Sequence, residues 1–261
     1  WNCEVSWQAE NYLNMRKGEK LETFLRLAKE GKIGMQALYC NMLTGLCSHE
    51  QLCRLVYFAH TAHRKYGFPC ESAMINDVPG LMSTMPTMLA SAGIRYFSEG
   101  INNDRAYPNT HFQTKSPVWW EGPDGSRVLM MFFYSYAHAS GWGLQSSLET
   151  ARANILNMLR GLEARKDYPY DAVMANGAVS DNCPLDPRLA EVAKQWNDRY
   201  AFPTVILCHN QAFFEYIEKN YGDKLPVIRG DTGGYWEDGA GSSARETTLC
   251  RNAHEALGAA E

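Results

Sequence analysis

The stretch Ser72-Ala73-Met74-Ile75-Asn76-Asp77-Val78-Pro79-Gly80 (SAMINDVPG) predicts a short buried strand that runs into a polar turn. Residues 72–75 are a compact, mainly apolar run, and Pro79-Gly80 is a turn signal. In barrels and open α/β sheets, functional side chains collect just past the carboxyl ends of strands. Asp77 is therefore a candidate functional residue, although a lone aspartate at such a position is more commonly a turn former or a helix cap.

Helical and extended patterns alternate on both sides of this stretch, which predicts an α/β fold. Ser48 and Gln51 have the spacing of a capping box before the helix at 52–63. With no internal repeat or low-complexity linker, residues 1–261 are expected to form a single domain. The other predicted helices are 20–29, 84–92, 148–166, 187–199 and 211–220, and the predicted strands are 33–38, 72–75, 94–97, 128–136, 171–175, 203–207 and 227–229.

The composition excludes some classes of function. The chain has 261 residues, 45% of them hydrophobic, which is enough for a sizeable core. Its formal net charge of -4 predicts no nucleic-acid partner, and no apolar run approaches the ~20 residues that span a bilayer. The eight cysteines are scattered and form no Cys-x-x-Cys motif. We therefore expect reduced thiols with structural roles.

Two more predicted strands end in segments that carry functional groups. Residues 128–136 end at Tyr134-Ser135-Tyr136, and residues 171–175 precede the segment from Gly177 to Asn182, which contains Asp181. Asp181 lies among turn-forming residues, so a turn is again an alternative to a catalytic role.

Several segments, in order along nearly the whole chain, resemble the catalytic domain of glycoside hydrolase family 38, the α-mannosidases, especially its bacterial branch. Each motif is moderately specific, and their common order carries the resemblance. The motifs are Trp1-Asn2-Cys3-Glu4, Asn76-Asp77-Val78-Pro79-Gly80, Leu89 to Tyr96, Trp120 to Ser126, Phe133-Tyr134-Ser135-Tyr136, Asn176 to Asn182, Gly230 to Gly239, and Arg251 to Leu257.

The resemblance implies that residues 1–261 form a single, partial catalytic domain, with the segment near 245–261 leading into a helical region. The expected fold is a seven-stranded (β/α) barrel-like domain of the glycoside hydrolase/deacetylase type, here without its first strand. It also implies a zinc ion and a retaining mechanism on mannosides or oligosaccharides. Asp77 matches the family's nucleophile, which is also a zinc ligand, and Asp181 matches the general acid/base. In a retaining enzyme the two carboxyl groups lie about 5–5.5 Å apart, and the acid requires a raised pKa.

A sugar site also needs flat apolar faces and hydroxyl-binding groups. Tyr136, Trp142 and Trp236 are the candidate faces, and Asn182 and Asp238 are the candidate hydroxyl partners, although most aromatic residues of a domain pack its core. Tyr136 matches an active-site tyrosine of the family. Ala137 departs from the acidic substrate-binding residue of the animal enzymes, which leaves the sugar specificity open.

The zinc site is incomplete within the sequence. The family takes a His-x-Asp pair from its first strand and a further histidine from the downstream helical region, so Asp77 is the zinc ligand expected here and the remaining ligands are expected outside this chain. His60 and His63 have an i, i+3 spacing, but they fit surface or core positions of an amphipathic helix better than a metal site. His138 is expected near the cleft and not as a ligand.

Two other functions remain open. A metal-dependent carbohydrate deacetylase would use a His-x-x-x-His helix, which the sequence lacks. A non-catalytic carbohydrate-binding remnant of the fold would keep the strands and the aromatic residues without complete zinc ligands.

Overall fold

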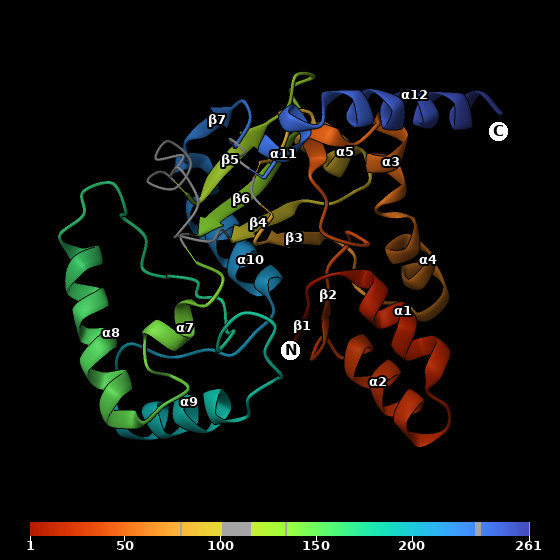
Figure 1. The fold of residues 1–261 in the computed structure, drawn as a ribbon. Coiled ribbons are helices and arrows are strands. Elements are labelled where there is room, and N and C mark those ends of the chain that lie inside the picture. The colour runs from red at the N-terminus through yellow and green to blue at the C-terminus, as the bar shows by residue number, and fades with distance from the viewer. Residues whose placement is uncertain (79, 101–115, 134, 233–235, 261) are drawn as a thin grey trace.

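The computed structural model describes residues 1–78, 80–100, 116–133, 135–232 and 236–260. Figure 1 shows a sheet flanked by helices, with the C-terminal helix α12 extending from one corner. The strands are β1 (Asn2–Cys3), β2 (Gly34–Met35), β3 (Ser72–Asn76), β4 (Tyr96–Gly100), β5 (Val118–Glu121), β6 (Arg127–Phe133) and β7 (Val227–Arg229). The helices are α1 (Ser6–Met15), α2 (Glu19–Lys29), η1 (Thr44–Leu46), α3 (His49–Arg54), α4 (Tyr57–Tyr66), α5 (Met85–Ser91), α7 (His138–Gly141), α8 (Leu148–Glu163), α9 (Arg188–Arg199), α10 (Asn210–Tyr221), η2 (Gly222–Lys224), α11 (Asp238–Ser242) and α12 (Ala244–Ala260).

The central sheet has five strands in the order β3-β4-β6-β5-β7. Strands β3, β4 and β6 are parallel, and their register places Asn76, Gly100 and Phe133 side by side. Strand β5 is antiparallel to β6. A separate parallel pair, β1 and β2, is linked to β3 where Ala37 N–H donates to Ser72 O at 2.9 Å. The loops that follow three parallel strands therefore begin at one edge of the sheet.

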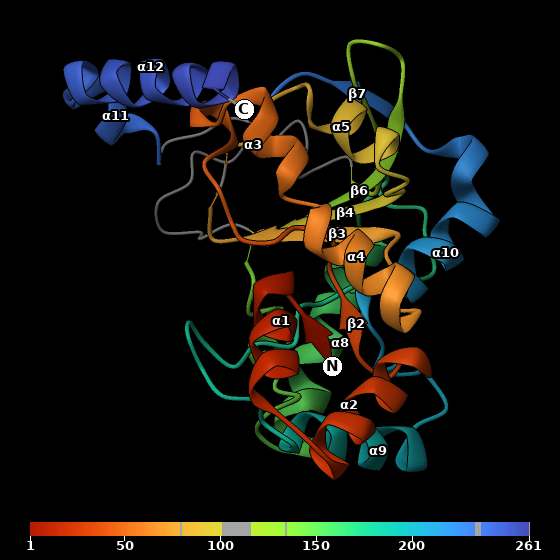
Figure 2. The same cartoon turned by 90° about the vertical axis from the view of Figure 1, so that its right-hand side faces the viewer.

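The alternation of side chains in β6 explains why helices cover both faces of the sheet. Val128, Met130 and Phe132 belong to a core that includes residues of α3, α4 and α5. Leu129, Met131 and Phe133 belong to a second core with residues of α10. Figure 2 shows α5 and α10 on opposite sides of the sheet. The packing of helices on both faces of the sheet fixes the strand ends that carry the candidate site.

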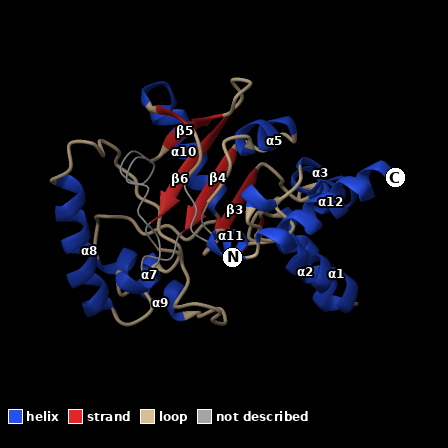
Figure 3. Cartoon of the chain, turned by 45° about the horizontal axis from the view of Figure 1, so that its top comes forward, coloured by secondary structure: helices blue, strands red, loops and turns tan. Residues whose placement is uncertain are grey.

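Two smaller hydrophobic clusters lie beside the sheet. Helices α1 and α2 pack around Phe24 and Phe68. Helices α7, α8 and α9 pack around Ile155 and Trp196, and Figure 3 shows this group of helices set apart from the strands. Among the described residues, no helix is long and apolar enough to cross a membrane.

A polar network inside the molecule joins α10 to the sheet. The Asn210 side chain exchanges hydrogen bonds with Gln36, accepting at 2.6 Å and donating at 3.1 Å. It also contacts the hydroxyl groups of Ser72 and Ser98 at 3.4 and 3.3 Å. Because these groups are buried, each needs a partner inside the protein.

The α/β class predicted from the sequence is confirmed, as is the capping box of Ser48 and Gln51. The predicted helix 52–63 is instead two helices that meet near Leu55 and Val56. Strand β5 and helix α1 were not predicted. The described strands form open sheets of two and five strands and do not close into the seven-stranded barrel that the resemblance implies.

Two predicted strands, 171–175 and 203–207, are wrong for the structure, which gives both segments irregular backbone. Residue Val205 shows the physical reason, because its N–H and C=O bind the side chain of Asn197 at 2.9 and 2.8 Å instead of a neighbouring strand. Ile206 is 74% exposed, so the apolar pattern does not correspond to a buried strand here.

All eight cysteines lie in the described part of the chain and are free, as expected. Burial raises the pKa of the Cys3 thiol to about 12 and that of Cys70 to about 11, which keeps both thiols protonated.

Candidate active site

Asp77 lies directly after β3, at the edge where the parallel strands end. Its φ of 58° is in the left-handed region, which a non-glycine residue adopts uncommonly and which is often a feature of functional turns. Its N–H donates to Gly100 O at 2.7 Å, and the side chain of Asn41 donates to the preceding carbonyl, Asn76 O, at 3.2 Å. The backbone that carries Asp77 is thus held from two sides.

Gly100, at the end of β4, is the point on which the neighbouring segments converge. A β-carbon at this position would collide with Asn76 Oδ1 and would lie 3.1 Å from Tyr136 Cβ and 3.2 Å from Asn176 Nδ2. One small region is therefore shared by four segments: the ends of β3 and β4, the loop after β6, and the irregular segment near Asn176. The structure places Tyr136 in this region, beside the strand pair that leads to Asp77.

Several buried polar atoms on these segments have no hydrogen-bond partner in the described structure. They are Asn41 Oδ1, Asn76 Oδ1, His138 Nδ1, Gln145 Oε1 and Asn176 Nδ2. A buried donor or acceptor without a partner costs free energy, so such a group in a native protein calls for an explanation, which can be a functional role, a bound water or an ion. The set contains both donors and acceptors without a net charge, which suits hydroxyl groups.

The segment that contains Asn176 is fastened to the start of α7. Ala139 N–H donates to Asn176 O at 3.0 Å, and Gln145 Nε2 donates to Gly177 O at 2.7 Å. These bonds fix the backbone from which the chain continues to Asp181. None of Asn41, Asn76, Asn176 or Gln145 was named as a site residue from the sequence, although Asn76 and Asn176 begin two of the quoted motifs.

Asp181 and Asn182 lie in an exposed turn. Asn182 has a φ of 50°, and the N–H of Ser180 donates to Cys183 Sγ at 3.5 Å across the turn. The turn that the sequence predicts around Asp181 is confirmed. A catalytic role for Asp181 stays a prediction.

His138 and Trp142 lie on and just after α7. The His138 ring packs against Phe133, with ring centroids 5.6 Å apart, and against Trp142 at 6.4 Å. Burial lowers the pKa of His138, so its imidazole is neutral at pH 7. Trp142 lies one helical turn from His138. It is half-buried and packs against the hydrophobic cluster of α7, α8 and α9, so it contributes to packing.

Trp236 and Asp238 follow β7 on a segment that binds the turn after Asp77. Trp236 is half-buried, and Asp238 begins α11. The preceding Asp231 accepts from Ser83 N–H at 2.6 Å. Pro79, Tyr134 and residues 233–235 of the quoted motifs lie outside the described residues.

Glu99 is a buried carboxyl group at this edge that the sequence analysis missed. It is 0% exposed, and burial raises its pKa to about 8, against opposing hydrogen bonds from Thr232 and Gly80. Glu99 lies two residues beyond the predicted strand, which stopped at residue 97, and no local pattern marks it as buried. A second missed acid, Glu4, follows β1 and accepts from Asn41 Nδ2 at 2.8 Å.

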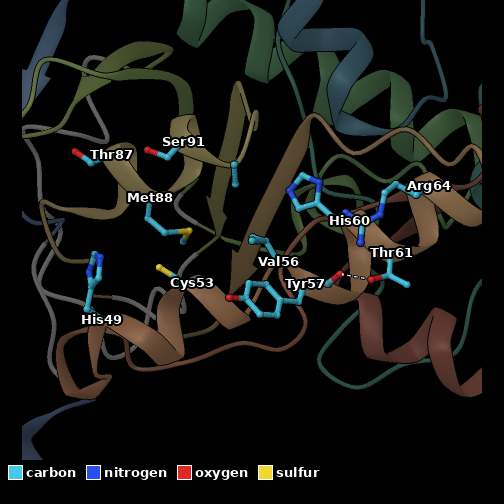
Figure 4. Close-up of a pocket in the computed structure, with 11 residues that line it drawn as sticks. His49, Cys53, Val56, Tyr57, His60, Thr61, Arg64, Thr87, Met88 and Ser91 are labelled. Carbon is cyan, nitrogen blue, oxygen red and sulfur yellow. Dashed lines mark hydrogen bonds between the residues drawn. The ribbon is translucent and has the colours of Figure 1, made fainter. Parts of the chain in front are cut away.

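The described residues contain no group of three His, Cys, Asp or Glu side chains that could hold a metal ion. The groups around Asp77 are mainly amides, which do not fit the nitrogen, sulfur and carboxylate ligands of zinc. His60 and His63 do not form a metal pair. His63 Nδ1 lies 2.6 Å from Phe68 O, and His60 lines a cavity of about 550 Å³ between α3, α4 and α5 (Figure 4).

Residues 1–231 match the profile described as "Glycosyl hydrolases family 38 N-terminal domain". The chain belongs to glycosyl hydrolase family 38. Two solved structures have a similar fold: an alpha-mannosidase from Enterococcus faecalis V583 (TM-score 0.71, 20% identity, covering 89% of this chain and 26% of that one) and a glycosyl hydrolase family 38 protein from Enterococcus faecalis (TM-score 0.58, 20% identity, 88% and 24%). No curated protein matches the chain.

The family 38 chain spans about a quarter of the length of these two structures. The resemblance inferred from the ordered motifs is confirmed, and it extends over most of the sequence. Membership places the chain among the glycoside hydrolases.

Proposed function

We propose that this chain forms the catalytic domain of a retaining, α-mannosidase-like glycoside hydrolase that cleaves α-linked mannosides or related glycosides. The observation that carries the proposal is the convergence of Asn76, Tyr136 and Asn176 on Gly100, beside Asp77 in its left-handed turn. Family membership supports the reaction class.

In the proposed reaction, Asp77 attacks the anomeric carbon while Asp181 protonates the departing glycosidic oxygen. This step forms a glycosyl ester on Asp77 and releases the aglycone as an alcohol. Asp181, now ionised, removes a proton from water, which attacks the same carbon and releases Asp77 as a carboxylate. The hydrogen bond from Asp77 N–H to Gly100 O supports this role, because it holds the attacking residue on a rigid strand end.

The sugar would satisfy the polar atoms that have no partner in the described structure. Its hydroxyl groups can donate to Asn41 Oδ1 and Asn76 Oδ1 and accept from Asn176 Nδ2. Tyr136, Trp142 and Trp236 would offer apolar faces, and Asn182 and Asp238 further hydroxyl partners. Since His138 is neutral, it can take part in hydrogen bonds to hydroxyl groups without attracting a charged ligand.

Zinc enters the proposal only through Asp77, with its other ligands expected outside this chain. The family's zinc would hold adjacent sugar hydroxyls when bound. The described residues do not complete such a site, and the proposed steps use the carboxyl groups of Asp77 and Asp181 alone.

The test uses the full-length protein and an aryl α-mannoside. Wild type should release the aryl alcohol and form the α-anomer of mannose first, which NMR detects, and Asp77→Asn should lower kcat by about 10³-fold or more. Correct folding of the variant is checked by circular dichroism. Inversion of the anomer, or unchanged turnover by Asp77→Asn, would contradict the mechanism, and sugar binding without hydrolysis by wild type would favour the non-catalytic alternative.

A further inference from the structure

Glu99 is a buried acid to which the proposed reaction gives no part. It lies next to Gly100 at the end of β4, opposite Ile75 of β3, and its side chain is not accessible to solvent. No cation forms an ion pair with it in the described part of the chain. Its polar contacts are instead with the segments beside the Asp77 turn.

The hydroxyl group of Thr232 connects Glu99 to the turn. Thr232 Oγ1 accepts from Leu81 N–H at 2.9 Å and lies 3.5 Å from Glu99 Oε1. A hydroxyl group has one proton, so a hydroxyl that accepts from Leu81 can donate to Glu99. Thr232 N–H also donates to Leu81 O at 3.0 Å, which makes the link to Leu81 reciprocal.

A second contact of Glu99 reaches the turn directly, because the backbone of Gly80 lies close enough to the carboxyl group to lower its pKa. The carbonyl of Gly80 accepts from Thr44 Oγ1 at 3.2 Å, and the same hydroxyl accepts from Met82 N–H at 3.2 Å. Residues 80–83 are thereby held by η1, by Glu99 and by the segment after β7.

The two ends of the turn are thus fixed by neighbouring residues of one strand. Gly100 holds the backbone of Asp77 through its carbonyl, and Glu99 accepts from Thr232, whose hydroxyl oxygen accepts in turn from Leu81 N–H. A rigid turn keeps a reacting group in productive geometry, and small displacements of such a group lower the rate strongly.

We propose that Glu99 is a positioning residue that fixes the turn carrying Asp77 and joins it to the segment after β7. This inference rests on the proposed function, since it gives Glu99 a part in the same site. Glu99 acts through its hydrogen bond from Thr232 and its contact with the Gly80 backbone, and it does not touch the substrate. An apolar residue of similar size would fill its space but would leave the Thr232 hydroxyl without this acceptor.

The experiment compares Glu99→Leu, Glu99→Gln and the control Glu121→Gln in the full-length protein. Glu121 is also buried, but it pairs with Arg127 at 2.6 Å beside the amino end of β6. Glu99→Leu should lower kcat for the aryl α-mannoside by about 100-fold, with KM changed less than about 3-fold. Glu99→Gln should stay within about 3-fold of wild type, because its amide oxygen can still accept from the Thr232 hydroxyl. Hydrogen exchange of the 80–83 amides should be faster in Glu99→Leu and unchanged in Glu121→Gln.

The outcomes separate this inference from the proposed function. An inactive wild type would contradict the proposed function, while the exchange data still decide whether Glu99 fixes the turn. An active wild type with unchanged kcat or unchanged exchange in Glu99→Leu would overturn the positioning role, as would equal losses in the Leu and Gln variants. If Glu99→Leu does not fold, Thr232→Val replaces it: a lower kcat supports the proposal, and an unchanged kcat overturns it.

Discussion

The N–H of Asp77 donates to the carbonyl oxygen of Gly100 at 2.7 Å, which fastens the candidate nucleophile to the end of the neighbouring strand. Gly100 has a second role at the same place, because the absence of a side chain leaves room for Asn76 Oδ1. One residue therefore contributes both the backbone support of Asp77 and the space in which Asn76, Tyr136 and Asn176 meet.

Gly100→Ala tests this relationship. The added methyl group would collide with Asn76 Oδ1 and crowd Tyr136 and Asn176. We expect kcat/KM for an aryl α-mannoside to fall by about 10- to 100-fold, with a loss of stability of about 1–3 kcal/mol. Gly161→Ala, on α8, is the matched control, because a β-carbon at this position has no neighbouring atom within 4 Å. This variant should leave activity unchanged and raise the free energy of unfolding by up to about 1 kcal/mol. Equal activity of Gly100→Ala and wild type would show that the space at Gly100 is not used.

Asp181→Asn tests the proposed acid through the leaving group of the substrate. An aryl group with a low pKa leaves without protonation, whereas an alkyl group requires a proton. We expect the variant to lose about 100-fold or more in kcat/KM with a methyl mannoside and much less with a dinitrophenyl mannoside. Steady-state kinetics over a series of leaving groups gives the comparison, and an equal loss with all of them would exclude the acid role.

The parts of the site that were predictable from the sequence are those with a local pattern. The run from Ser72 to Ile75 and the following Asn76-Asp77 specify a strand and its end, and the structure has β3 at Ser72–Asn76. Ser48 and Gln51 likewise specify a helix start within four residues. The family was recognisable because its motifs occur in a common order.

The parts that were not predictable depend on contacts between distant residues. Nothing near Asn176 indicates that it meets Gly100, which is 76 positions earlier in the chain, and Glu99 acquires its role only through Thr232. Apolar periodicity was also insufficient at 203–207, where the side chain of Asn197 satisfies the backbone groups that a strand would pair. Tertiary contacts, and not propensity, decide such positions.

Asn210→Ala should be among the more destabilising changes outside the site. Asn210 is 7% exposed, and its side chain contacts Gln36, Ser72 and Ser98, so its removal leaves buried polar groups without partners. We expect a loss of about 2–4 kcal/mol in the free energy of unfolding, measured with urea. Asn220→Ala, an exposed position on the same helix, is the control and should change stability by less than about 1 kcal/mol. A similar small change at Asn210 would contradict the structural role of the network.

Glu99 should make the stability of the protein depend on pH. Burial raises its pKa from 4.5 to about 8, so the folded state keeps the proton over a range in which the unfolded state has lost it. The contribution of the neutral acid is fully present below pH 4.5 and is lost as the pH rises toward about 8, with a slope on the order of 1 kcal/mol per pH unit. Glu99→Gln cannot ionise at this position, so it does not lose this contribution as the pH rises. The free energy of unfolding of the variant should therefore increase relative to that of wild type between pH 4.5 and about 8, and the difference should be constant above pH 8. Urea unfolding of both proteins between pH 4.5 and 9 measures the difference, and a difference independent of pH would show that Glu99 titrates alike in the folded and unfolded states.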